Sequence, residues 1–134
     1  AIAGVLAMRP ETLILDEPTA GLDPSGRKDI LALIQGLHAG GTTVVMVSHS
    51  MEDVAKLATR IAVMNHCGLA MVGAAREVFA NGNALIEMGL DVPAAVRLAD
   101  MLRAKGLQIP TEIYQMDALR TWLLGHDKGG EAHA

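Results

Sequence analysis

The sequence has little of what proteins that bind nucleic acids or depend on disulfides need. Its 134 residues contain one Phe, one Trp, one Tyr and one Cys, and the formal net charge is −4 at pH 7. Without a basic face or stacking surfaces, direct binding of DNA or RNA is not expected. The single cysteine, Cys67, cannot form an internal disulfide, and no apolar run is long enough to cross a bilayer. We therefore expect a soluble, cytoplasmic chain.

The hydrophobic content is nevertheless ample. At 51% hydrophobic residues, a chain of this length can build one ordinary domain with its own core. The opening segment AIAGVLAM predicts a helix that has no N-cap before it. We therefore expect the chain to be the later part of a longer protein.

Strands and helices alternate in the first part of the chain. Thr12–Leu15 predicts a strand, and Asp23 followed by Pro24 predicts an N-cap with proline at the first helical position. The apolar residues that follow have helical spacing and predict one buried helix face: Ile30, Leu33, Ile34 and Leu37.

The alternation continues beyond this helix. Thr42–Ser48, rich in β-branched residues, predicts a strand covered on both faces of a parallel sheet. Ser50, with Asp53 after it, has the pattern of a capping box for another helix. RIAVMN and LAMVG predict a hairpin that closes the sheet. This order favours an α/β fold with a parallel sheet flanked by helices.

Only short helices are expected after Gly73. The clearest is Val92–Lys105, which Gly106 can terminate. Its apolar positions share one face: Val92, Ala95, Val96, Ala99 and Leu102. We expect an α/β part over residues 1–80, a small helical subdomain over 84–124 and a flexible tail over 125–134.

Polar side chains stand where two of the predicted strands end. Asp16 and Glu17 follow the first strand, and Ser48 and His49 lie at the end of the next. Ligands of open α/β sheets bind beyond the carboxyl ends of the strands. Because a carboxylate at the edge of a core loses hydration, it needs a cation or a hydrogen-bond donor in exchange. A hydrated magnesium ion with a phosphate chain would supply both.

Three motifs around these residues resemble those of the ATP-binding cassette (ABC) ATPases. LILDEP resembles the Walker B segment, AGLDP resembles the D-loop, and VSHS resembles the switch-histidine loop. An isolated Asp-Glu pair or histidine is usually structural, but here the order, spacing and predicted strand context of all three motifs agree. The resemblance covers Ala1 to about Phe79 and implies a P-loop NTPase-like (RecA-like) fold.

The resemblance also implies roles for individual residues. Asp16 would hold Mg²⁺ through water, Glu17 would be the general base that polarises the attacking water, and His49 would contact the γ-phosphate of ATP. Asp23 would be both a helix cap and part of the loop that touches an opposite subunit. The residues implied to bind the nucleotide are Asp16, Gly21, Leu22, Asp23 and Ser48.

Two motifs of that family are absent from these 134 residues. There is no G-x-x-x-x-G-K-[ST] phosphate-binding loop and no LSGGQ signature. We therefore expect the chain to represent the later part of an ATPase domain and to be inactive by itself.

The segment MGLDVPAAVRLADMLRAKG, Met88–Gly106, looks like the C-terminal segment of the A-component ATPases of energy-coupling factor transporters. Those transporters, including the cobalt and nickel group, take up vitamins or metal ions. The resemblance implies a second ATPase subunit, a membrane-embedded coupling protein and a substrate-binding component as partners. It also implies a peripheral location on the inner face of the cell membrane.

Other interpretations of the sequence remain open. The segment could be a generic capping helix on the ATPase of another ABC importer. The chain could instead end a soluble ABC protein that acts on ribosomes or DNA, or it could be a truncated product with no activity. The transported substrate is not encoded in these motifs, because the membrane components select it.

Overall fold

The computed structural model describes residue 4 and residues 7–127. The chain divides into two compact units between Asp53 and Val54, and each is described here by itself. Most of the helix expected over the first eight residues lies outside the described part of the chain.

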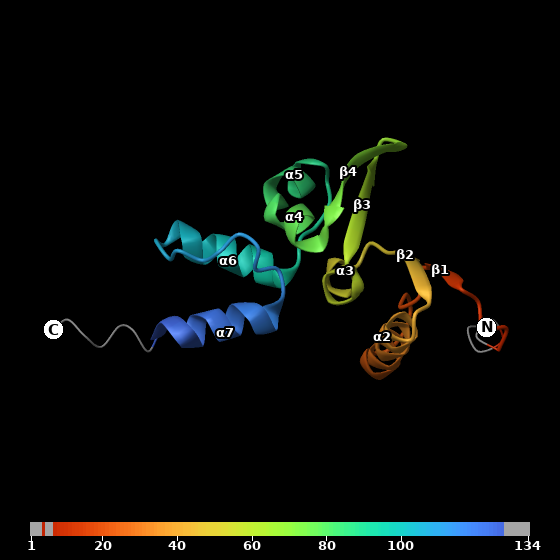
Figure 1. Cartoon of the computed structure of the whole chain (residues 1–134). Helices are drawn as coiled ribbons and strands as arrows, with labels where there is room; N and C mark the ends of the chain where they lie inside the picture. The colour runs from red at the N-terminus through yellow and green to blue at the C-terminus, as the bar shows by residue number, and fades with distance from the viewer. Residues whose placement is uncertain (1–3, 5–6, 128–134) are drawn as a thin grey trace. The chain divides into compact units, whose positions relative to one another are not determined.

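The first unit is built on a parallel pair of strands, β1 (Thr12–Asp16) and β2 (Thr43–Val47). The helix α2 (Pro24–Ala39) connects the strands and packs against β2 (Figure 1). Leu13 pairs with Val44, and the register continues to Asp16 opposite Val47. The expected parallel pairing, with its crossover helix, is confirmed.

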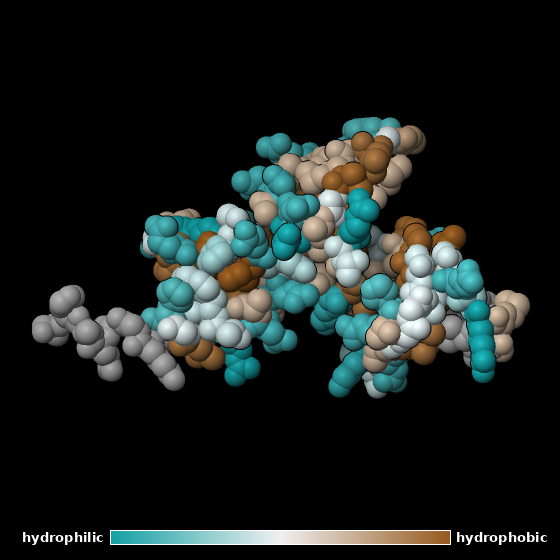
Figure 2. Space-filling model, in the orientation of Figure 1, coloured by the Kyte–Doolittle hydropathy of each residue, from teal (hydrophilic) through white to brown (hydrophobic). Residues whose placement is uncertain are grey.

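The two faces of the β1–β2 pair differ in burial. Leu13 and Leu15 are buried, whereas Ile14 between them is 71% exposed. Val45 and Val47 are also exposed, and hydrophobic residues lie on the surface of these strands in Figure 2. The prediction that the second strand is covered on both faces is wrong for the described residues, because α2 can cover only one of them.

The helix α2 begins as the sequence predicts. The Asp23 carboxylate accepts a hydrogen bond from the backbone N–H of Gly26 at 3.0 Å, as an N-cap residue should. Its buried residues are Leu31 and Ile34, whereas Leu33 is 38% exposed. The assignment of Leu33 to the buried face is therefore wrong. The buried face is narrower than predicted, because its fully buried residues are only Leu31 and Ile34, three positions apart.

The helix α3 (Met51–Leu57) begins in the first unit and continues into the second. There, β3 (Arg60–Asn65) and β4 (Gly68–Ala74) form the predicted hairpin and are antiparallel. The prediction that the hairpin closes the parallel sheet is wrong within the described residues, since β3 and β4 form a separate two-stranded sheet. β3 pairs with its immediate neighbour in the chain, as the short turn favours.

Short helices follow the hairpin, as the sequence predicts: α4 (Ala75–Ala80), α5 (Gly82–Glu87), α6 (Ala94–Ala104) and α7 (Met116–Asp127). α6 and α7 lie side by side in Figure 1. They enclose a small core of Ala95, Ala99, Ile109 and Leu119, all at most 4% exposed.

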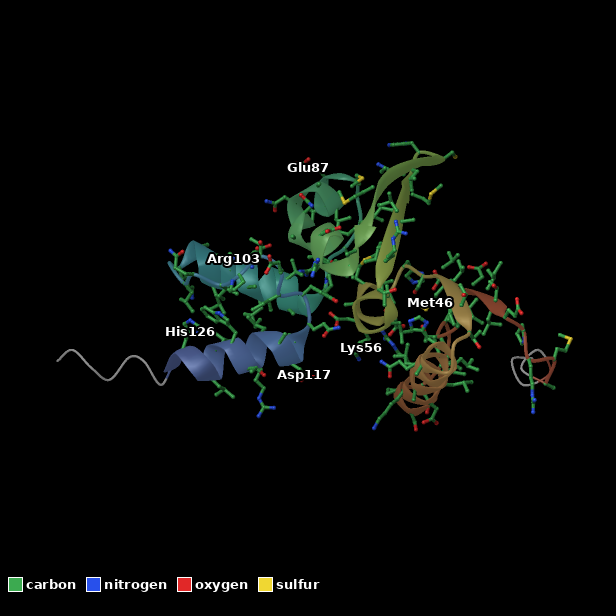
Figure 3. The ribbon with its side chains drawn as sticks, viewed as in Figure 1. Met46, Lys56, Glu87, Arg103, Asp117 and His126 are labelled. Atoms are coloured by element: carbon green, nitrogen blue, oxygen red, sulfur yellow. The ribbon has the colours of Figure 1, made fainter. Side chains whose placement is uncertain are left out.

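Local contacts fix the end of α6. Gly106 has φ +98°, a left-handed conformation that suits glycine just beyond a helix, so its predicted role as terminator is confirmed. Arg103, labelled in Figure 3, donates from Nε to the backbone oxygen of Ile109 at 2.7 Å. These contacts tie the connection between α6 and α7 to the helix that precedes it.

The end of the chain is described only in part. α7 extends to Asp127, and residues 128–134 lie outside the described part, so the expected tail stays a prediction. Within the described residues, none of the helices has the length and apolar character that a membrane crossing requires.

Candidate active site

The two parallel strands bring Glu17 and His49 into contact at their carboxyl ends. The backbone N–H of Glu17 donates to the backbone oxygen of Val47 at 2.9 Å, which extends the β1–β2 pairing by one residue. The Glu17 carboxylate oxygen Oε1 accepts the backbone N–H of His49 at 2.9 Å and lies 2.7 Å from Nδ1 of its ring. Glu17 and His49, which follow neighbouring parallel strands, are therefore in direct contact.

The contact leaves both side chains accessible. The His49 side chain is 85% exposed and that of Glu17 is 31% exposed. Because a carboxylate oxygen without a hydrogen can only accept, a hydrogen bond between these two atoms needs a hydrogen on Nδ1 of His49. Ion pairs in contact with solvent add little to stability. The pair is therefore expected to add little to the stability of the fold.

The backbone of Glu17 is itself unusual. Its φ is +46°, a left-handed conformation that residues other than glycine rarely adopt. Such a conformation costs on the order of 1–3 kcal/mol, and it persists where the surrounding structure fixes it, often at functional sites. This left-handed conformation turns the chain after β1, and the Glu17 carboxylate lies beside His49.

Asp16 occupies the last position of β1 and is exposed. Its carboxylate is a hard oxygen ligand of the kind that Mg²⁺ prefers. The described residues contain no group of three or more His, Cys, Asp or Glu side chains that could hold a metal ion. A single carboxylate such as that of Asp16 suits a Mg²⁺ ion that takes its other ligands from water and phosphate, as Mg²⁺ in phosphoryl-transfer sites usually does.

The other residues predicted for the site lie in the loops after the strands. Gly21 has φ +72°, which a glycine adopts without strain, and Leu22 is 43% exposed. Asp23 uses its carboxylate to cap α2, while Ser48 Oγ accepts the backbone N–H of Ser50 at 3.1 Å. Gly21 and Leu22 are thus exposed, and Asp23 and Ser48 form hydrogen bonds within their own loops.

A buried polar network beside the site was not predicted. Asp53 is completely buried and receives hydrogen bonds from Arg27 and from Thr19. The sequence identified Asp53 only as half of a capping box with Ser50. The backbone N–H of Asp53 does donate to Ser50 Oγ at 3.4 Å, but the N–H of Ser50 donates to Ser48 instead of to Asp53.

The second half of the predicted capping box is therefore wrong, because the Asp53 carboxylate is used by a charged partner. A charge-assisted hydrogen bond to a guanidinium is stronger than one to a backbone amide. The only signal in the sequence was a pair of opposite charges, Arg27 and Asp53, on two neighbouring predicted helices. Their long separation in sequence made the pairing impossible to specify.

Curated relatives match nearly the whole chain. The energy-coupling factor transporter ATP-binding protein EcfA2 of Symbiobacterium thermophilum is 53% identical over 135 residues, which cover 98% of this chain and 46% of that protein. The EcfA2 protein of Clostridium perfringens is 53% identical, covering 92% of this chain and 44% of its own length. EcfA1 of Symbiobacterium thermophilum is 48% identical over 89% of this chain and 42% of its own length. The chain thus spans less than half the length of these relatives.

A solved structure supports the same relationship. It is that of cbiO1 from Clostridium perfringens, described as part of the ABC transporter complex cbiONQ. The match has a TM-score of 0.54 and 34% sequence identity, and it covers 76% of this chain and 40% of the other. No protein-family model matches the chain.

Proposed function

This chain is a homologue of the ATP-binding proteins of energy-coupling factor transporters, and on that premise we propose that the complete protein hydrolyses ATP to power such an importer. The observation that carries the proposal is the contact between Glu17 and His49 at the ends of two parallel strands. It supplies a carboxylate and an imidazole at the place where α/β folds bind nucleotides.

ATP hydrolysis requires little covalent chemistry from the protein. Phosphoryl transfer depends on positioning the attacking water and on stabilising the charge of the phosphate oxygens. Glu17 is the general base: its carboxylate accepts a hydrogen bond from the attacking water and takes up its proton. His49 donates one ring hydrogen to Glu17, and we assign its ring to the γ-phosphate and to the orientation of the water.

Asp16 and Glu17 divide two tasks between adjacent carboxylates. Asp16, exposed at the end of β1, would hold Mg²⁺ through water, and the ion would supply charge neutralisation for the phosphates. Glu17 is held by its contact with His49 and stays available as a base. The remaining nucleotide contacts are Ser48 in the loop of His49, and Gly21, Leu22 and Asp23 in the loop that faces a second subunit.

The partners follow from the transporter type. We assign to the complete protein a second ATPase subunit, a membrane-embedded coupling protein and a substrate-binding component. These partners would place it on the inner face of the cell membrane. The imported compound, a vitamin or a transition-metal ion, is selected by the membrane components and not by this chain.

The proposal is tested by reconstituting the complete protein with its membrane components in lipid vesicles. ATP hydrolysis and solute uptake should both require Mg²⁺, and both should stop on chelation. Asp16→Asn should raise the Mg²⁺ concentration needed for half-maximal hydrolysis, because it removes one negative charge near the ion. Hydrolysis that proceeds without a divalent ion, or uptake that proceeds without ATP, would contradict the proposal.

A further inference from the structure

Asp53 is the only fully buried charged side chain among the described residues, at 0% exposure. Both of its carboxylate oxygens are occupied. Oδ1 accepts hydrogen bonds from Nε and Nη2 of Arg27 at 2.9 and 2.7 Å, and Oδ2 accepts one from the Thr19 hydroxyl at 2.7 Å. A buried carboxylate is costly unless it is paired and hydrogen-bonded, so this set of contacts is held in one arrangement.

Asp53 is connected to both loops that carry the candidate catalytic residues, to one directly through Thr19 and to the other through Arg27 of α2. Thr19 lies two residues after Glu17, in the loop before α2. Arg27 Nη2 also donates to the hydroxyl of Ser50 at 2.7 Å, and Ser50 directly follows His49. All of these residues belong to the first structural unit. We call Thr19, Arg27, Ser50 and Asp53 the brace.

The brace can explain how the site keeps its geometry. The Glu17–His49 contact is exposed, and the backbone of Glu17 is strained at φ +46°. A strained residue keeps its conformation only where its surroundings over-determine it. Thr19 fixes the chain after Glu17, Ser50 fixes the chain after His49, and the guanidinium and carboxylate between them are rigidly paired.

We propose that Asp53 is a positioning residue for ATP hydrolysis, which acts through Arg27 and Thr19 to hold the Glu17 and His49 loops at their hydrogen-bonding distance. Asp53 touches neither the nucleotide nor the water in this account. This inference rests on the proposed function for its rate effect.

Thr19→Val gives the sharpest test, because valine has nearly the shape of threonine and lacks only the hydroxyl. In the complete protein, kcat for ATP hydrolysis should fall about tenfold while KM for ATP stays within about threefold, since orientation is lost and binding is kept. Thr19→Ser keeps a hydroxyl that can reach Asp53 and should restore at least half of the wild-type kcat.

A second measurement needs no turnover. The backbone N–H of His49 donates to Glu17, so its hydrogen-exchange rate without nucleotide reports the spacing of the two loops. Thr19→Val should speed this exchange about threefold or more, and Thr19→Ser should not. The matched control is Thr121→Val on α7, where the lost hydroxyl bond, to the Asp117 backbone oxygen at 2.9 Å, is exposed. It should change neither kcat nor the His49 exchange rate.

The outcomes separate the two proposals. If Thr19→Val leaves both the His49 exchange rate and kcat unchanged, the brace does not position the site. If it lowers the melting temperature while kcat per folded molecule stays at the wild-type value, the role is structural and the inference is also overturned. A wild-type protein that does not hydrolyse ATP would refute the proposed function, whereas the exchange rates would still decide whether the brace holds the loops.

Discussion

At the scale of single residues, the site combines a strained backbone with an exposed pair. Glu17 is turned out of β1 at φ +46°, and its carboxylate meets both the backbone N–H and the ring of His49. Two hydrogen bonds to one oxygen orient the carboxylate firmly. A base that is oriented before substrate arrives lowers the cost of reaching the transition state.

His49→Ala should reduce hydrolysis far more than nucleotide affinity. In the proposed mechanism the ring contacts the γ-phosphate and orients the water, so in the complete protein kcat should fall about a hundredfold and the ATP dissociation constant should change by much less. The rate is measured as phosphate release, and the affinity by equilibrium binding.

His38→Ala is the control for this prediction, because His38 is exposed in the last turn of α2 and should tolerate the change. A loss of affinity as large as the loss of rate would mean that His49 only holds its loop.

At the scale of elements, the N-terminus of α2 is capped by the side chain of Asp23. Asp23→Ala removes the carboxylate that accepts the Gly26 N–H, at a cost of about 1 kcal/mol to this helix end. In the complete protein, amide exchange at Gly26 should therefore become roughly fivefold faster. Asp23→Ser should restore the cap and slow the exchange again.

The same pair of variants separates the cap from the subunit contact. If Asp23→Ser recovers the cap but not ATP hydrolysis, the carboxylate has the second role that the resemblance implies. Full recovery of hydrolysis would leave Asp23 as a cap alone.

The connection between α5 and α6 carries a charge that responds to acid. The backbone N–H of Val92 donates to Asp91 at 2.7 Å and lowers the pKa of that carboxyl below its ordinary value of 3.8, and the ion pair with Arg97 lowers it further. A lowered pKa means that the folded state favours the ionised form. The contribution to stability is thus present above pH 3.8 and is lost as the pH falls through the lowered pKa.

A carboxyl-carbon NMR titration of Asp91 in the complete protein measures this effect. Its midpoint should lie below 3.8 in the wild type, and it should rise only in part in Arg97→Gln, because the backbone hydrogen bond is the larger cause. A midpoint at or above 3.8 in the wild type would contradict the assignment.

Local signals predicted most of the elements and failed where the answer depends on distant partners. The cap at Asp23, the β3–β4 hairpin and the stop at Gly106 depend on neighbours in sequence, and all three are confirmed. The exposure of Val45 depends on which elements cover the sheet, and the burial of Asp53 depends on a side chain from another helix. Periodicity carries no information about either.

The site was predictable for a similar reason. Glu17 and His49 each directly follow or closely follow a parallel strand, so the pairing of β1 with β2 places them together. The direct hydrogen bond between them and the positive φ of Glu17 could not be predicted from the sequence and are seen only in the structure. The brace could not be predicted from the sequence, because each of its residues already had a local explanation as a loop, helix or cap residue.

At the scale of the whole molecule, the proposed function implies that these 134 residues supply only part of a nucleotide site. Asp16, Glu17 and His49 are present, but no phosphate-binding loop with its lysine occurs in these 134 residues. Purified alone, the chain should neither bind ATP tightly nor hydrolyse it, because nothing positions the γ-phosphate. It should also tend to aggregate through the exposed face of β1 and β2, which carries Ile14 and Val45.

Equilibrium dialysis with ATP, phosphate release and light scattering test these statements together. Addition of the segment with the phosphate-binding loop, covalently or as a second chain, should restore solubility and Mg²⁺-dependent hydrolysis. Efficient hydrolysis by the isolated 134 residues, abolished by Glu17→Gln to exclude a contaminant, would overturn this description of the site.

Multiple-turnover hydrolysis by Glu17→Gln in the complete protein tests the central claim most directly. The amide keeps the shape of the side chain and loses the base, so kcat should fall by at least about a hundredfold while ATP binding is retained. Glu87→Gln, at an exposed position on α5 labelled in Figure 3, is the matched control and should hydrolyse ATP at the wild-type rate. If Glu17→Gln sustains hydrolysis near that rate, Glu17 is not the general base, and the proposed mechanism is wrong.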